Sequence, residues 1–227
     1  MSTERIAYSG TPLRYGVLSV ATNVYIDGFN LYYGCLKGTP YKWLDLERFC
    51  RRMLPADEIG TIRYFTAHVS GKRDPGAPLR QGIYLRALKT LPSVSTHFGA
   101  FLTHNVWMPL SSPPASGPRK VQVVKTEEKG SDVNLASHLL LDGFRRSCDT
   151  AVVVSNDSDL TEPLRIARHD LGMKVGVLNP HPPDKRSRTL SQDAHFFKQI
   201  RPAVLSASQF PTTLLDSVGT FHKPAAW

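Results

Sequence analysis

The sequence lacks the marks of several large protein classes. Its three cysteines, Cys35, Cys50 and Cys148, have neither the number nor the spacing of a disulfide framework or a zinc site. The amino-terminal apolar run at 17–26 is interrupted by polar residues and is too short to cross a membrane, and no signal-peptide layout precedes it. A glycine-rich phosphate loop ending in lysine is also missing, which excludes a P-loop NTPase. We therefore expect a cytoplasmic protein without membrane association.

Acidic residues are fewer than basic ones. The 227 residues include 28 lysines and arginines against 19 aspartates and glutamates, which gives a net charge of +9. A basic balance favours a polyanionic partner such as nucleic acid, although net charge carries no information about fold.

Short apolar segments alternate with segments of helical periodicity. The pattern predicts strands at 23–26, 59–69, 94–102, 151–154 and 175–178, and helices at 29–36, 45–53, 78–91, 130–146 and 160–171. Such alternation is typical of a parallel sheet with helices on both faces. We predict a doubly wound α/β domain whose mainly parallel sheet has roughly five core strands.

Composition divides the chain into one domain and two tails. Residues 1–20 and 204–227 are weakly patterned and are expected to be tails, and 21–203 forms the domain. Within it, 104–128 contains two extended segments around a tip rich in proline and serine at 111–118. We predict that this part projects as a β-ribbon arm, which serves as a substrate clamp or as the contact of a homo-oligomer.

Carboxylates follow two of the apolar strands. Asp27 ends the first strand, Asp157 and Asp159 follow the strand at 151–154, and Asp132 lies in the first turn of the preceding helix. In open α/β sheets, sites form at the carboxyl ends of the strands, so these acids should meet at one rim. Clustered carboxylates repel one another unless a cation lies among them, and hard oxygen ligands suit Mg²⁺ or Mn²⁺. These metals activate water for phosphodiester hydrolysis.

Each of these acids also has a purely structural explanation. Asp27 before a glycine fits a turn, Asp132 fits the start of a helix, and Asp159 fits a helix cap. Their shared position at one rim favours a functional explanation. The histidines show no ligand spacing, and Ser155 has no partners in the order of a hydrolase triad, so neither group is predicted to be catalytic.

Three motifs carry a family resemblance. The segments are VYIDGFNL at 24–31, KGSDV at 129–133 and VSNDSDL at 154–160. Together they resemble the NYN domain family of PIN-like, metal-dependent ribonucleases, over about residues 20–200. The resemblance implies a PIN-like, Rossmann-related fold and a site at which the matching residues are Asp27, Asn30, Asp132, Asp157 and Asp159, with Ser155 and Asn156 shaping the loop.

The last part of the resemblance is weaker. Such domains often close with a Leu-x-x-x-Ala-Asp-x-Phe-like stretch, and the corresponding segment here is LSQDAHFF at 190–197. Either His195 replaces the family's acid or Asp193 takes its place from a shifted position.

The leading hypothesis is a metal-dependent endoribonuclease. Asp27, Asp132 and Asp157 would ligate the metal, while Asp159 and Asn30 would orient water or a second ion. Basic residues on the same rim are predicted to bind the RNA backbone: Lys72, Arg73, Arg119, Lys120, Lys125, Lys129, Lys185, Arg186 and Arg188. The alternative is a catalytically inactive RNA-binding or scaffold module on the same fold. A phosphatase with Asp27 as the nucleophile is disfavoured, because Phe29 stands where such enzymes place a second aspartate.

Overall fold

The computed structural model describes residues 21–72 and 74–227. The expected tail at 1–20 and the predicted RNA-binding residue Arg73 lie outside this part of the chain. Within it, no helix is long and apolar enough to cross a membrane.

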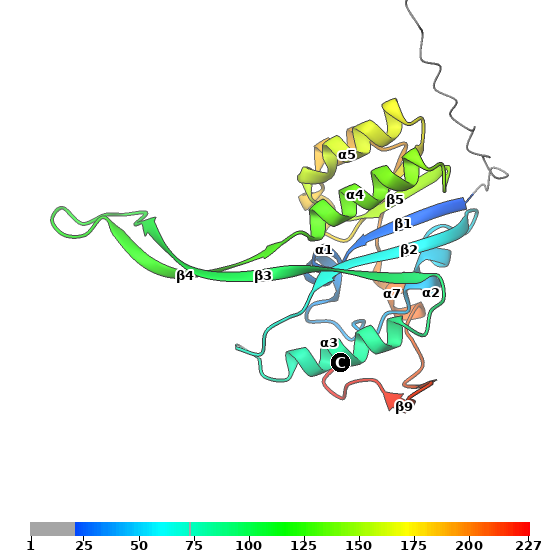
Figure 1. Ribbon diagram of the computed structural model, residues 1–227, viewed down its shortest axis with the longest axis horizontal. Coiled ribbons are helices and arrows are strands. Elements are labelled where there is room, and N and C mark those ends of the chain that lie inside the picture. The colour runs from blue at the N-terminus through cyan, green and yellow to red at the C-terminus, as the bar shows by residue number, and fades with distance from the viewer. Residues whose placement is uncertain (1–20, 73) are drawn as a thin grey trace, which may run out of the picture.

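A seven-stranded sheet in the order β4-β3-β2-β1-β5-β6-β7 forms the body (Figure 1). All neighbours are parallel except β3 and β4. The strands are β1 (Ala21–Asp27), β2 (Glu58–Ala67), β3 (Val94–Pro109), β4 (Lys120–Lys129), β5 (Thr150–Val154), β6 (Lys174–Asn179) and β7 (Phe196–Gln199). This arrangement confirms the predicted α/β class; besides the five expected core strands, the sheet contains β4, which belongs to the predicted arm, and β7.

Strand β1 lies at the centre of the sheet, and all seven of its residues are buried. From β1 the chain adds β2, β3 and β4 on one side, and then β5, β6 and β7 on the other. The switch in strand order therefore falls between β1 and β5. Ligands of open α/β sheets bind beside such a switch, at the carboxyl ends of the strands.

Helices cover both faces of the sheet and define two apolar clusters (Figure 1). One cluster contains residues of α1 (Gly28–Leu31), η1 (Tyr32–Leu36), α2 (Leu46–Met53), α3 (Ala77–Leu88) and α7 (Pro202–Ala207). The other contains residues of α4 (Ser131–Phe144), η2 (Ser158–Leu160), α5 (Thr161–Arg165), η3 (Ile166–Asp170) and α6 (Arg188–Asp193). A further short turn, η4 (Pro183–Lys185), precedes α6.

Two predicted helices differ in detail from those observed. The helix expected at 29–36 is a short α-helix followed by the π-helical turn η1, and that expected at 160–171 is divided into η2, α5 and η3. Strand β7 has four residues and was not predicted, because so short a segment gives little periodic signal.

The carboxyl-terminal segment at 204–227, expected as a weakly patterned tail that wraps the surface, packs onto the body and has secondary structure of its own. It completes α7 and forms the hairpin of β8 (Thr213–Asp216) and β9 (Gly219–His222). Phe210 and Phe221 are buried in the first cluster, and the ring of Trp227 lies 6.3 Å from that of Trp43. Aromatic residues with irregular spacing give no periodicity, so the sequence did not reveal this packing.

The predicted β-ribbon arm is confirmed. The first part of β3 pairs with β2, and the part from Ala100 to Pro109 pairs with β4 and extends away from the body (Figure 1). The arm leaves the sheet at Gly99, where a β-carbon would lie 2.7 Å from the carbonyl oxygen of Lys129. Gly130 ends the arm with a φ of 100°, a conformation that favours glycine. These close contacts fix the base of the arm against the start of α4.

Candidate active site

Asp27 ends β1 and is only 4% exposed. Its Oδ1 accepts a hydrogen bond from the backbone N–H of Asn30 at 2.9 Å, which caps α1, and its Oδ2 accepts one from the Ser155 hydroxyl at 3.1 Å. The next position requires glycine, since a β-carbon on residue 28 would lie only 2.7 Å from the carbonyl oxygen of Phe65. The motif thus holds one carboxylate at the carboxyl end of the central strand.

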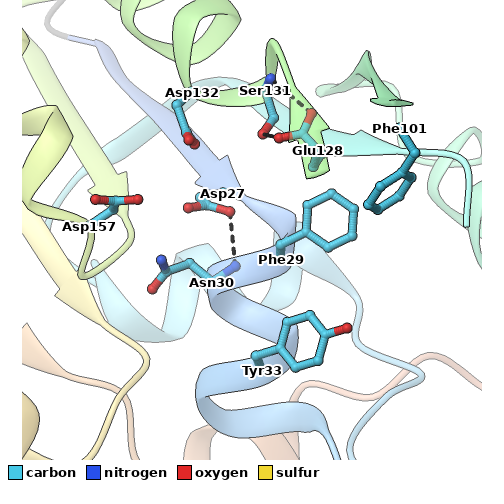
Figure 2. A pocket seen from close by; sticks show the side chains of 9 residues that line it. All are labelled: Asp27, Phe29, Asn30, Tyr33, Phe101, Glu128, Ser131, Asp132 and Asp157. Atoms are coloured by element: carbon cyan, nitrogen blue, oxygen red, sulfur yellow. Dashed lines mark hydrogen bonds between the residues drawn. The ribbon is translucent and has the colours of Figure 1, made fainter. Parts of the chain in front are cut away.

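An acidic cavity of about 280 Å³ opens in front of Asp27 (Figure 2). It receives Asp132 from the first turn of α4 and Asp157 from the loop after β5. The complete lining is Asp27, Phe29, Asn30, Tyr33, Phe101, Glu128, Ser131, Asp132 and Asp157. None of these side chains is basic, so the acids face one another without a cationic partner in the lining.

The pKa values reflect this arrangement. The pKa of Asp27 is raised to about 6, mainly by burial and in part by the charges of Asp132 and Asp157, against the lowering effect of the two hydrogen bonds. Burial also raises the pKa of Asp132, with contributions from the charges of Asp157, Glu128 and Asp159. The carboxylates are therefore close enough to destabilise one another's ionised forms.

The loop after β5 is tied to the site by polar side chains. The Asn30 side-chain carbonyl accepts a hydrogen bond from the backbone N–H of Asn156 at 3.0 Å, and Ser155 accepts one from that of Asp157 at 3.1 Å. The Asn156 side chain bonds the Lys185 carbonyl and the Ser187 N–H, both at 2.7 Å. Ser155 and Asn156 therefore connect this loop to β1 and to the segment before α6.

The acids of this loop differ in position. Asp157 lines the cavity, and its Oδ1 also accepts a hydrogen bond from the Asp159 N–H at 3.0 Å, which caps η2. Asp159 is exposed and does not line the cavity, although its charge contributes to the raised pKa of Asp132. The two predicted carboxylates thus lie at different distances from the centre of the site.

Five lining residues were not predicted from the sequence. Glu128 accepts hydrogen bonds from the Ser131 N–H at 3.1 Å and from its hydroxyl at 2.6 Å, and so caps α4 in place of a side chain at Gly130. A glutamate three residues before a helix-starting serine was the available signal. Phe29, Tyr33 and Phe101 form an aromatic wall, with the rings of Phe29 and Phe101 5.6 Å apart. Phe29 and Tyr33 are one helical turn apart, but no periodic signal joins them to Phe101 of the arm.

The donor chemistry fits a hard divalent cation. Four carboxylates, those of Asp27, Glu128, Asp132 and Asp157, line one cavity, and the raised pKa values of Asp27 and Asp132 mean that a cation would relieve their repulsion. Within the described part of the chain, no three His, Cys, Asp or Glu side chains form a ready-made metal centre. Carboxylate oxygens are the ligands that a hard ion such as Mg²⁺ prefers.

Neither alternative for the last family position reaches the cavity. His195 accepts a hydrogen bond from the Val175 N–H through Nδ1 at 3.0 Å, and Asp193 lies 3.9 Å from a ring nitrogen of His169. Neither His195 nor Asp193 lines the cavity.

The basic residues predicted to bind RNA are exposed wherever the structure describes them: Lys72, Arg119, Lys120, Lys125, Lys129, Lys185, Arg186 and Arg188. On the arm, however, Lys125 and Lys129 both form ion pairs with Glu127, at 2.7 and 3.6 Å. Their charge is partly neutralised there. Lys185 belongs to the segment that the Asn156 side chain connects to the loop after β5.

A family model described as the NYN domain matches residues 21–201. The chain belongs to the NYN domain family. It is 35% identical over 234 residues to a protein of Pseudomonas putida named 6-hydroxy-3-succinoylpyridine 3-monooxygenase HspA, and the match covers 91% of this chain and 75% of that protein.

Among solved structures, a protein of unknown function from Vibrio parahaemolyticus has a similar fold. The TM-score is 0.54 at 17% sequence identity, and the match covers 82% of this chain and 96% of that one. At this identity the likeness shows a shared α/β fold and nothing further. The predictions of family and fold class are therefore confirmed.

Proposed function

We propose that this NYN protein is a metal-dependent phosphodiesterase that cleaves RNA. The observation that carries the proposal is the acidic cavity, where Asp27, Asp132 and Asp157 converge from three parts of the chain without a basic residue in the lining. A buried carboxylate with a pKa of about 6 costs stability, and such a cost is typical of functional sites.

In this proposal Asp27, Asp132 and Asp157 hold Mg²⁺ or Mn²⁺. The bound ion would supply a more acidic water and stabilise charge that develops on the phosphate. Hydrogen bonds of Asn30 and Ser155 fix the position of Asp27 relative to the loop that carries Asp157. Asp159, at the outer edge, and Asn30 orient water or a second ion.

The aromatic wall and the exposed basic residues supply substrate contacts in this proposal. Phe29, Tyr33 and Phe101 present ring surfaces on which bases of single-stranded RNA can stack. Lys185 and Arg186, beside the loop that Asn156 anchors, are placed to bind backbone phosphates. RNA binding through these residues is expected to weaken steeply with salt.

A second candidate is oxidation of a small aromatic compound. It is favoured by the 35% identity to a protein named as a pyridine monooxygenase and by the aromatic wall of the cavity. We rank it below RNA cleavage because uncompensated carboxylates in the cavity repel an anionic organic substrate, whereas a metal ion would allow them to bind a phosphate.

The test compares the purified protein with two matched aspartate variants on labelled single-stranded and structured RNA. Cleavage is expected with Mg²⁺ or Mn²⁺ and not with a chelator, and Asp27→Asn and Asp157→Asn should reduce it at least about 100-fold. Asp149→Asn, at an exposed position before β5, is the control and should retain activity. Mn²⁺ should raise the melting temperature of the wild type more than that of Asp27→Asn.

Three outcomes would redirect the proposal. RNA binding without cleavage by any form would favour the inactive RNA-binding or scaffold module. Oxygen uptake with a hydroxypyridine and an electron donor, but no RNA cleavage, would favour the oxidation. Equal cleavage by wild type and both variants would place the activity outside this cavity.

A further inference from the structure

The outer half of the arm exposes apolar side chains on both faces. Residues alternate between faces along each strand. One face carries Met108 and Val121, which pair directly and are 44% and 37% exposed. The other carries Trp107 and Val124, which are 66% and 72% exposed. An apolar ribbon of two strands is unstable in water unless another surface covers it.

A second uncovered apolar surface lies along α4. Val133, Ser137, Leu141 and Phe144 follow one another at helical spacing and are all exposed, Val133 and Phe144 to 69%. We call these four residues the α4 stripe. The two acids of the helix, Asp132 and Asp142, point to the cavity and to Arg63, and α4 contains no lysine, arginine or glutamate. A solvent-facing helix surface normally carries charges, so an uncharged stripe indicates a covered face.

These two surfaces cannot meet within one chain. Helix α4 begins immediately after β4, and the arm extends away from the body in the opposite sense (Figure 1). Two copies related by a twofold axis can pair them twice, because the arm of each copy can reach the stripe of the other. Each copy carries a net charge of +9; the α4 stripe is uncharged, and Lys125 of the arm is paired with Glu127, which limits the repulsion between the two contacting surfaces.

We propose that two copies of this chain form a twofold dimer in which the arm of each copy lies along the α4 stripe of the other. The ten residue pairs of the arm span about 30 Å and the 14 residues of α4 about 21 Å, so the arm is long enough to cover the helix. Two contacts of about 21 Å by 10 Å, counted on both copies, bury about 800 Å² in total, which is at the lower limit for a specific interface.

The dimer has a consequence for the acidic cavity. The α4 stripe begins at Val133, next to Asp132, and the base of the arm contributes Phe101 and Glu128 to the lining. The partner's arm would therefore lie at the rim of this cavity. The dimer itself rests on the exposed apolar side chains and on the matching lengths of the arm and α4, and does not depend on RNA cleavage.

The first experiment measures mass in solution by light scattering or sedimentation. The wild type is expected at twice the chain mass of 25.2 kDa. Val124→Glu on the arm and Phe144→Glu on α4 should each shift the protein to a monomer and weaken association at least tenfold. Val218→Glu is the matched control, because Val218 is 83% exposed outside both surfaces, and it should leave the mass unchanged.

Thermal unfolding checks that both variants remain folded, as their exposure predicts. A monomeric wild type would overturn the proposal, and an effect of Val124→Glu on RNA binding in that monomer would assign the arm to nucleic acid. A dimer that neither variant weakens would also overturn it.

The second experiment mixes the two variants. A mixed dimer of Val124→Glu with Phe144→Glu retains one native arm-to-helix contact, because one chain supplies an intact arm and the other an intact helix. Native mass spectrometry should therefore show more mixed dimer than either self-dimer. Absence of this excess would mean that each surface pairs with its own kind, which contradicts the proposed arrangement.

Discussion

Asp27 and Asp142 are two buried aspartates of the same domain, at 4% and 3% exposure, with opposite surroundings. The Asp142 carboxylate accepts two hydrogen bonds from Arg63, at 2.9 and 3.0 Å, and others from Tyr25 at 2.8 Å and Asn23 at 3.2 Å. Asp27 accepts one backbone and one hydroxyl hydrogen bond and faces other carboxylates. Burial by itself therefore does not mark a functional carboxylate; the sign of the neighbouring charge separates the two.

The neighbours of each aspartate follow from its end of the sheet. Asp142 lies near the end of α4, where Arg63 of β2 supplies a cation and Tyr25 of β1 supplies a proton donor. Burial raises the pKa of Tyr25, together with the charges of Cys148 and Asp142, so this hydroxyl keeps its proton and donates. Asp27 lies at the carboxyl end, where strand ends deliver acids. The surroundings of Asp142 stabilise its ionised carboxylate, whereas those of Asp27 leave the repulsion between neighbouring carboxylates uncompensated.

Removing the Arg63 guanidinium that pairs with Asp142 should have the largest effect on stability. Arg63→Ala leaves a buried carboxylate without its charge partner, so we expect a loss of about 3 kcal/mol in the free energy of unfolding. Denaturant unfolding at neutral pH measures the change. Arg80→Ala, which breaks the pair with the exposed Asp74, is the control and should cost less than about 1 kcal/mol. Equal losses in the two variants would mean that the buried Arg63–Asp142 pair stabilises the fold no more than the exposed Arg80–Asp74 pair.

Removing the charge of Asp27 should change the free energy of unfolding in the opposite direction. Asp27→Asn relieves burial of an ionised group and its repulsion by Asp132 and Asp157, and should raise the free energy of unfolding by about 1–2 kcal/mol at pH 7 without metal. The lost acceptor for the Ser155 hydroxyl keeps the gain below the full value of the pKa shift. A destabilised Asp27→Asn protein would mean that Asp27 is as well paired as Asp142.

The gain from Asp27→Asn should depend on pH in a defined window. The pKa of Asp27 is about 6 in the folded protein and 3.8 in the reference state, so the folded state binds more protons between these values. The contribution of Asp27 to the free energy of unfolding of the wild type is therefore most favourable at low pH, and it is lost as pH rises through about 6. The difference between variant and wild type should grow by about 2 kcal/mol from pH 4 to pH 7. A difference independent of pH would contradict the raised pKa.

The smallest expected change comes from Ser155→Ala. This substitution removes the hydroxyl bond that lowers the pKa of Asp27 and the acceptor of the Asp157 N–H, so stability at pH 7 should fall by about 1 kcal/mol. The pKa of Asp27 should rise further, which carboxyl NMR titration measures. Ser158→Ala, in the same loop but exposed, is the control. A lower Asp27 pKa in Ser155→Ala would show that the hydroxyl does not stabilise the ionised form.

The sequence by itself determined the class of fold, the family and the position of the acids. Alternating apolar and amphipathic segments require a layered α/β arrangement, and acids that directly follow buried strands must lie at the carboxyl end of a parallel sheet. The tip rich in proline and serine between two extended segments likewise determined the arm. These features are local, because a strand or helix imposes its periodicity on neighbouring residues.

Only the tertiary structure decided which distant side chains meet. Arg63 and Asp142 are 79 positions apart, and Trp43 and Trp227 pack together although one lies in a segment without periodic pattern. Glu128 and Phe101 enter the cavity because the arm returns to the sheet at Gly99 and Gly130. Pairing of this kind depends on strand order and close packing, which no local pattern encodes. The sequence therefore shows at which edge of the sheet the carboxylates lie, while the fold decides which of them have a basic side chain as a partner.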